Sequence, residues 1–113
     1  GTGVLDVGAL PGTDVYSPVD GTVAAITDYI VSGRKHGTRI DIRPTSAPSV
    51  VLSLTHLDPD PSLAVGSSVL AGTSKIGAVI DISTVERQAL ASHTNDAGDN
   101  VAIEVHSAPT TLP

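Results

Sequence analysis

The chain has 113 residues, the size of one domain, and its 40% hydrophobic content excludes a disordered segment. Its net charge of −6 excludes nucleic acid and anionic membrane surfaces as partners, because their phosphates would repel the domain. The absence of cysteine excludes disulfides, thiolate zinc sites and thiol nucleophiles. No apolar run is long enough to span a bilayer, so membrane insertion by this segment is not expected.

The composition favours an all-β domain. The chain lacks Phe, Trp and Met, so Val, Ile, Leu and Ala must fill the core, and β-branched residues suit a pleated sheet. Eleven glycines and eight prolines divide the chain into short apolar segments, which is typical of strands joined by turns. The predicted strands are, in chain order, Val4–Val7, Asp14–Tyr16, Gly21–Asp28, Thr38–Arg43, Val50–Leu57, Ser67–Leu70, Lys75–Ile82 and Asn100–His106.

The segment Thr38–Arg43 shows the clearest strand alternation. Ile40 and Ile42 fall on one face, and charged residues fall on the other. The pattern predicts a strand that buries its isoleucines and presents its charges to solvent.

One segment departs from the strand pattern. The run from Ser83 to Glu86 fits an S-x-x-E capping box, which predicts at most one short helix near 84–91. Residues 108–113 are predicted to form a C-terminal tail or linker, so the domain is placed at 1–107. Because the chain begins with Gly1 rather than Met, we expect it to be one domain of a longer protein.

Four segments carry a family resemblance when they are taken in order and spacing. They are Gly12–Val23, Thr55–Leu57, Val65–Gly77 and Asn100–Val105. In these segments, which cover nearly the whole chain, the sequence resembles the LytM-type (M23) zinc endopeptidases of bacterial cell walls. The resemblance implies a compact antiparallel β-sheet of the sandwiched-barrel hybrid type that is found in this family, with its duplicated hybrid motif.

The same resemblance implies a zinc ion held by two histidines and one aspartate, with the fourth position open to water. Asp6 matches the aspartate of the family's H-x-x-x-D motif, but Thr2 stands where its histidine is expected. Ala102 stands where the second histidine of the H-x-H motif is expected. A lone carboxylate cannot hold Zn²⁺ against water, so the sequence predicts no zinc site and no other cofactor.

The family has two catalytic histidines, and this sequence keeps one of them. His56 occupies one of them, and Asn100 replaces the histidine of the other. Without a metal-activated water, no peptidase activity is expected. Of the other histidines, His36 is predicted to lie in a solvated loop, and only His93 could swing toward the site from its loop. His106 lies too far along the last strand, about 13 Å from the expected ligand position.

The resemblance therefore implies a non-catalytic LytM-like domain, a pseudoenzyme that binds peptidoglycan or regulates a cell-wall hydrolase. It also implies a place in the bacterial cell envelope or outside the cell. The groove candidates are Asp6, His56, Asn100 and Glu104. Each also has a purely structural interpretation. Asp6 would serve a turn, and His56 would bond to a backbone carbonyl. Asn100 would only begin the last strand, and Glu104 would be a solvated strand residue.

Three other functions stay open at this point. The first is an active zinc metalloendopeptidase of peptidoglycan crosslinks that uses ligands not identified above. The second is a biotinyl- or lipoyl-like carrier, because Val65–Gly77 resembles half of that fold; its lysine, however, would be Lys75, which lies inside a predicted strand. The third is a structural spacer within a larger envelope protein.

Overall fold

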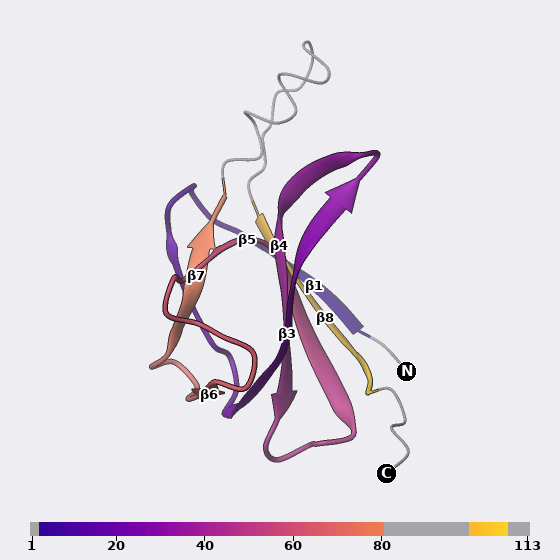
Figure 1. Ribbon diagram of the computed structural model, residues 1–113, viewed down its shortest axis with the longest axis vertical. Coiled ribbons are helices and arrows are strands. Elements are labelled where there is room, and N and C mark those ends of the chain that lie inside the picture. Colours follow the sequence, from indigo (N-terminus) through magenta and orange to yellow (C-terminus); the bar gives the residue numbers. More distant parts are fainter. Residues whose placement is uncertain (1–2, 81–99, 109–113) are drawn as a thin grey trace.

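The computed structural model describes residues 3–80 and 100–108, with the backbone alone described at 3–7 and 100, and all of its elements are strands (Figure 1). They are β1 (Gly3–Gly8), β2 (Asp14–Tyr16), β3 (Gly21–Val31), β4 (Arg34–Pro44), β5 (Val50–Pro59), β6 (Ser68–Val69), β7 (Lys75–Val79) and β8 (Asn100–Ser107). The all-β prediction is confirmed. The helix predicted near 84–91 lies outside the described residues.

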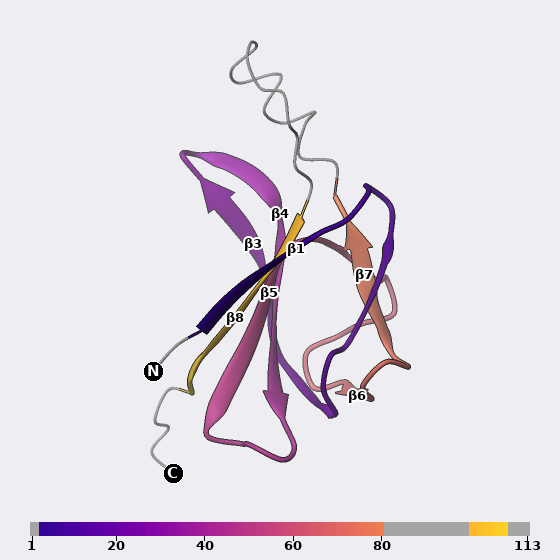
Figure 2. The ribbon, with the colours of Figure 1, turned by 180° about the vertical axis from the view of Figure 1, so that it is seen from behind.

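The strands form one antiparallel sheet in the order β1-β8-β5-β4-β3-β6, while β7 pairs with the end of β5 and β2 pairs with β7. Along most of its length β5 pairs with β4 and β8. Its last residues, Leu57–Pro59, pair with β7 instead. Because one strand serves both groups, the sheet curls, and β2, β6 and β7 lie opposite the main strands (Figures 1 and 2).

The core lies between these two groups of strands. Ile40 and Ile42 are completely buried, and Leu54 and Leu57 on the neighbouring strand are buried to within 1%. The burial of β4 alternates residue by residue, as the isoleucine pattern predicts. The other members of the core cluster are Val23, Leu52, Val69, Ile76, Val79 and Val101.

Two glycines in the resemblance segments stand where strands cross closely. A Cβ added to Gly21 would lie 2.4 Å from the carbonyl oxygen of Arg43, and one added to Gly77 would lie 2.5 Å from that of Asp58. Both distances are far inside van der Waals contact. These positions therefore admit no side chain without a shift of the backbone.

The predicted strand positions hold, with corrections at their ends. β3 and β4 are longer than predicted and meet in a tight turn at Ser32 and Gly33, whose φ angles of 52° and 77° suit a two-residue hairpin. His36 therefore lies inside β4 and is half-buried, so its prediction as a solvated loop residue is wrong. β7 ends at Val79, before the predicted end at Ile82. None of the described residues forms a helix long and apolar enough to cross a membrane.

Candidate functional site

The position at which the resemblance places zinc lies where β1, β8 and β5 run side by side. Asp6 pairs with Ala102, and Ala102 pairs on its other side with Thr55. Ala102 is half-buried and offers only a methyl group. Thr2 lies outside the described residues. A zinc ion does not fit this row of positions, because the row provides one carboxylate and no imidazole where the family uses two.

No other arrangement of the described side chains replaces it. Among them, no three His, Asp or Glu groups converge in a way that could hold a metal ion. Asn100, the first residue of β8, pairs with Gly8 at one end of the same strands, and Glu104 pairs with Val4 and Ser53 further along. The described strands thus place Asp6, Asn100 and Glu104 along one pair of strands, and His93 lies outside the described residues.

His56 lies next to this row, at an irregularity in β5. Two steps along β4, from Thr38 to Ile40, correspond to three steps along β5, from Leu57 to Leu54, so β5 carries one extra residue here. His56 has a φ of +69°, in the left-handed region that residues with a side chain rarely adopt. A β-bulge of this kind bends the strand and redirects a side chain, and such bulges are common beside active sites.

The imidazole of His56 is half-buried and is packed against a tyrosine. The ring of Tyr29 meets it edge-on, with the centroids 5.1 Å apart and the planes at 81°. The backbone of the bulge is also tied, because the amide of Ile80 donates to the carbonyl oxygen of His56 at 3.3 Å. Gly37, with a φ of +94°, passes so close that a Cβ there would lie 3.2 Å from the carbonyl carbon of His56. The bulge is therefore fixed from two sides.

A second group of polar side chains lies on β4, β5 and β8, on the face that alternates with the core. The hydroxyl of Ser53, which is 1% exposed, lies 2.7 Å from Oδ1 of Asp41 and 2.8 Å from Nε2 of His106. Nε of Arg39 donates to the same Asp41 oxygen at 2.8 Å, and its Nη2 lies 3.4 Å from Nε2 of His106. We call these four residues the polar cluster.

The polar cluster was not predicted from the sequence. The alternation of Thr38–Arg43 correctly places Arg39 and Asp41 on the face away from the core. Ser53 interrupts an otherwise apolar run from Val50 to Leu54, and this interruption is the signal that could have marked it. Its link to His106 depends on the register of β5 and β8, which no local pattern reveals.

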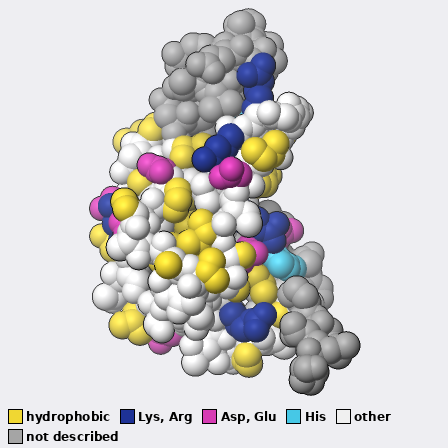
Figure 3. Space-filling model, in the orientation of Figure 1, with side chains coloured by type: hydrophobic (Ala, Val, Ile, Leu, Met, Phe, Trp, Pro, Cys, Tyr) yellow, Lys and Arg dark blue, Asp and Glu magenta, His cyan; other side chains and the backbone are white. Residues whose placement is uncertain are grey.

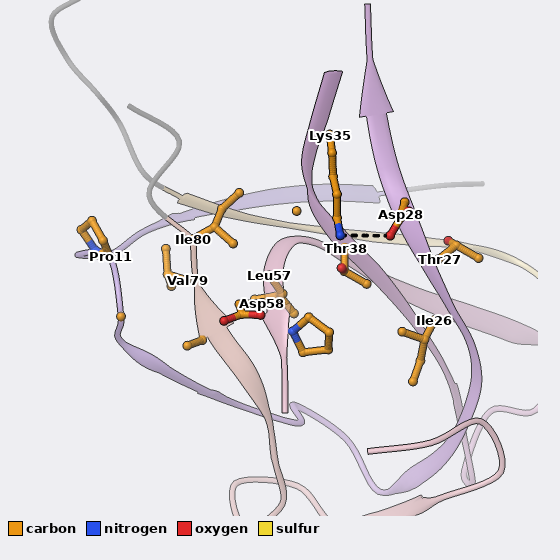
Figure 4. Close-up of a pocket in the computed structure, with 14 residues that line it drawn as sticks. Pro11, Ile26, Thr27, Asp28, Lys35, Thr38, Leu57, Asp58, Val79 and Ile80 are labelled. Atoms are coloured by element: carbon orange, nitrogen blue, oxygen red, sulfur yellow. Dashed lines mark ion pairs between the residues drawn. The ribbon is translucent and has the colours of Figure 1, made fainter. Parts of the chain in front are cut away.

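A groove of about 640 Å³ opens beneath the β3–β4 hairpin, next to the end of β5 (Figure 4). Asp28 and Lys35 point toward each other at its rim and form an ion pair of 3.3 Å. The opposite wall comes from the connection of β1 to β2 and from β7. Of the predicted groove residues whose side chains are described, neither His56 nor Glu104 lines this groove, although Leu57 and Asp58, which follow His56, do.

The comparisons with known proteins bear on the fold. Neither a scan against protein-family models nor a search of curated proteins gives a match. Among solved structures, the chain is similar to the NMR solution structure of lysostaphin, with a TM-score of 0.66 over 96% of this chain. This is a lysostaphin-like fold. The identity is 16%, so the likeness concerns the fold alone, and the chain spans 37% of the lysostaphin chain. The M23-like fold predicted from the motifs is thereby confirmed.

Proposed function

We propose that this lysostaphin-like chain is a non-catalytic domain that binds peptides of peptidoglycan on the strand face around His56. The observation that carries the proposal is the combination of two neighbouring positions. An imidazole is kept in a left-handed bulge at the family's catalytic turn, and a methyl group stands at the adjacent ligand position, Ala102. Such an arrangement favours contact with a ligand over hydrolysis.

The backbone of His56 supports this interpretation energetically. A left-handed conformation costs a residue with a side chain about 1–2 kcal/mol, whereas glycine adopts it freely. Residues held in this way cluster at functional sites. The ring of His56, which Tyr29 meets edge-on, is therefore a candidate for contact with a ligand.

Two alternatives have less support. A carrier domain would present Lys75, but this lysine is the first residue of β7 and forms an ion pair of 3.2 Å with Asp14. The hydrogen bond to Asp14 raises the pKa of Lys75, which disfavours the neutral amine that acylation needs. An active endopeptidase needs imidazole ligands that the row at Ala102 does not provide. We infer a place in the cell envelope or outside the cell, where peptidoglycan is found.

A sacculus pull-down tests the proposal. Purified chain is mixed with isolated sacculi, and the retained fraction is measured for the wild type, for His56→Ala and for Arg43→Gln. The wild type and Arg43→Gln should be retained, because Arg43 is exposed near the far end of β4 from the bulge, and His56→Ala should be released. Equal retention of all three, or retention of none, contradicts the proposal.

Elemental analysis and a peptide-cleavage assay on the same preparation test the non-catalytic part. We expect no stoichiometric zinc and no cleavage of peptide crosslinks after zinc is added. Stoichiometric zinc together with cleavage would establish the endopeptidase instead. Capture of a cell-wall hydrolase without sacculus retention would replace peptidoglycan with a hydrolase as the partner.

A further inference from the structure

The polar cluster shares β5 and β8 with the row of Asp6, Ala102 and Thr55, and it lies one row further along these strands. Ser53 pairs with Asp41 on one side and with Glu104 on the other, whereas Thr55 pairs with Ala102. A ligand that extends along β5 from His56 toward Ser53 would therefore reach the cluster next. Figure 3 shows a histidine at the margin of the molecule, with basic and acidic side chains beside it.

The protons of the cluster can be assigned from its contacts. The single proton of the Ser53 hydroxyl goes to Oδ1 of Asp41 at 2.7 Å, because a carboxylate oxygen can only accept. In the 2.8 Å contact with His106, the hydroxyl must then accept, so Nε2 of the ring carries a proton. The other ring nitrogen, Nδ1, lies 3.3 Å from the carbonyl oxygen of Ser107.

This assignment leaves two donors side by side. Since Nε2 of His106 carries a proton, it cannot accept from Nη2 of Arg39, which lies 3.4 Å away. Nε of Arg39 donates to Asp41 at 2.8 Å, and this bond holds the guanidinium in place. The Arg39 side chain is 36% exposed, so the group is open to solvent on one side. The imidazole N–H already donates to Ser53, whereas Nη2 of Arg39 has no acceptor oxygen among the described side chains, and the planar fork of the guanidinium matches a carboxylate.

We propose that the guanidinium of Arg39, held by Asp41 and lying beside His106, forms a subsite for the carboxylate group of a peptide ligand. The inference rests on the proposed function for the choice of ligand, since peptidoglycan stem peptides carry free carboxylates. Asp41 already neutralises Arg39, and Glu104 lies on β8 opposite Ser53 and two residues from His106, so directed donors rather than net charge provide the recognition. The subsite should therefore distinguish a carboxylate from an amide of the same shape.

The test uses N-acetyl-D-alanyl-D-alanine and its C-terminal amide as probes, titrated into the isotope-labelled chain and followed by NMR. The free acid should bind about tenfold more tightly than the amide, since a hydrogen bond to a charged group is worth about 1.5 kcal/mol or more. The acid should shift the signals of Arg39 and His106, and the amide should shift them much less. Equal binding of the two probes, or binding of neither, overturns the proposal.

Matched variants locate the effect. Arg39→Gln should abolish the preference for the acid, whereas Arg43→Gln should keep it. Arg43 is the control because it is an exposed arginine on the same strand and forms no ion pair with a described side chain. Arg39→Lys keeps the charge without the planar fork, and we expect it to lose most of the preference. A preference that survives Arg39→Gln, in a variant that melts like the wild type, also overturns the subsite.

Sacculus retention separates this inference from the proposed function. If the wild type is retained and Arg39→Gln is retained equally, the peptidoglycan proposal stands and the subsite is refuted. If the wild type is not retained but the free acid binds with the expected preference, the subsite stands and peptidoglycan is not its ligand.

Discussion

The two faces of β4, β5 and β8 use the same backbone for different purposes. On one face, Ile40, Ile42 and Leu54 are buried to within 1% and belong to the hydrophobic core cluster. On the other face, Ser53 is equally buried, but it lies under Arg39 and His106, which remain partly exposed. The apolar face holds the fold together by packing. The polar face is held by directed bonds that keep donors at fixed positions.

This comparison predicts that the apolar face carries more of the stability. Leu54→Ala should lower the free energy of unfolding by about 2–5 kcal/mol, because it leaves a cavity in a fully buried site. Leu70→Ala is the control, since Leu70 is 56% exposed, and it should change the value by less than about 0.5 kcal/mol. Urea denaturation measures both. Similar losses in the two variants would show that the core is not where the stability resides.

The polar face should contribute less to the free energy of unfolding than the apolar face, and substitution of Ser53 measures its contribution. Ser53→Ala removes the donor to Asp41 and the acceptor for His106, which should cost about 1–3 kcal/mol. The variant should also weaken the carboxylate preference, because the guanidinium and the ring lose their brace. A stability loss as large as that of Leu54→Ala would contradict the division between the two faces. Urea denaturation measures the stability loss, and the NMR titration measures the carboxylate preference.

His56 lies in the β5 bulge, and its substitution should separate ligand binding from stability. Asparagine tolerates the left-handed region better than most residues, so His56→Asn should change the free energy of unfolding by less than about 1 kcal/mol. Sacculus retention should nevertheless fall, because the imidazole is gone. A large loss of stability with retention unchanged would assign His56 to the fold instead.

The smallest expected effect is at an exposed turn far from either face. The side chain and the backbone amide of Ser62 both donate to Asp60 and lower the pKa of that carboxyl. A carboxyl with a lowered pKa in the folded state favours folding above its unfolded pKa, and that contribution disappears as the pH falls through the folded pKa. Ser62→Ala should move the pKa of Asp60 back toward its ordinary value, as an NMR titration of the carboxyl carbon would record. An unchanged titration would show that the backbone bond alone sets it.

The fold was largely predictable because its signals are local. The isoleucine alternation of β4 predicts which side is buried, and Gly21 and Gly77 stand where a side chain would strike a carbonyl oxygen. The position of His36 was missed because the turn at Ser32 and Gly33 extends the hairpin beyond the alternating segment. Hairpin length depends on that turn and on cross-strand pairs, which alternation does not report.

The candidate site was predictable only in part. The motif order placed Ala102 and His56, and β8 and β5 bring their neighbourhoods together as adjacent strands. The left-handed backbone at His56 could not be predicted from the sequence, because that position holds neither glycine nor asparagine, the residues that usually adopt this conformation. The polar cluster joins residues 12 and 53 positions apart, so it emerges only from the register of three strands.

The position of β8 has a consequence for how the chain is made. β8 lies between β1 and β5, so the first described strand and a central strand both take the last one as a neighbour. During synthesis, β5 has β4 beside it but cannot complete its other edge until residue 107 has left the ribosome. We therefore expect the sheet to close only after translation of almost the whole domain, and until then the open edge of β5 is exposed to pairing with other chains.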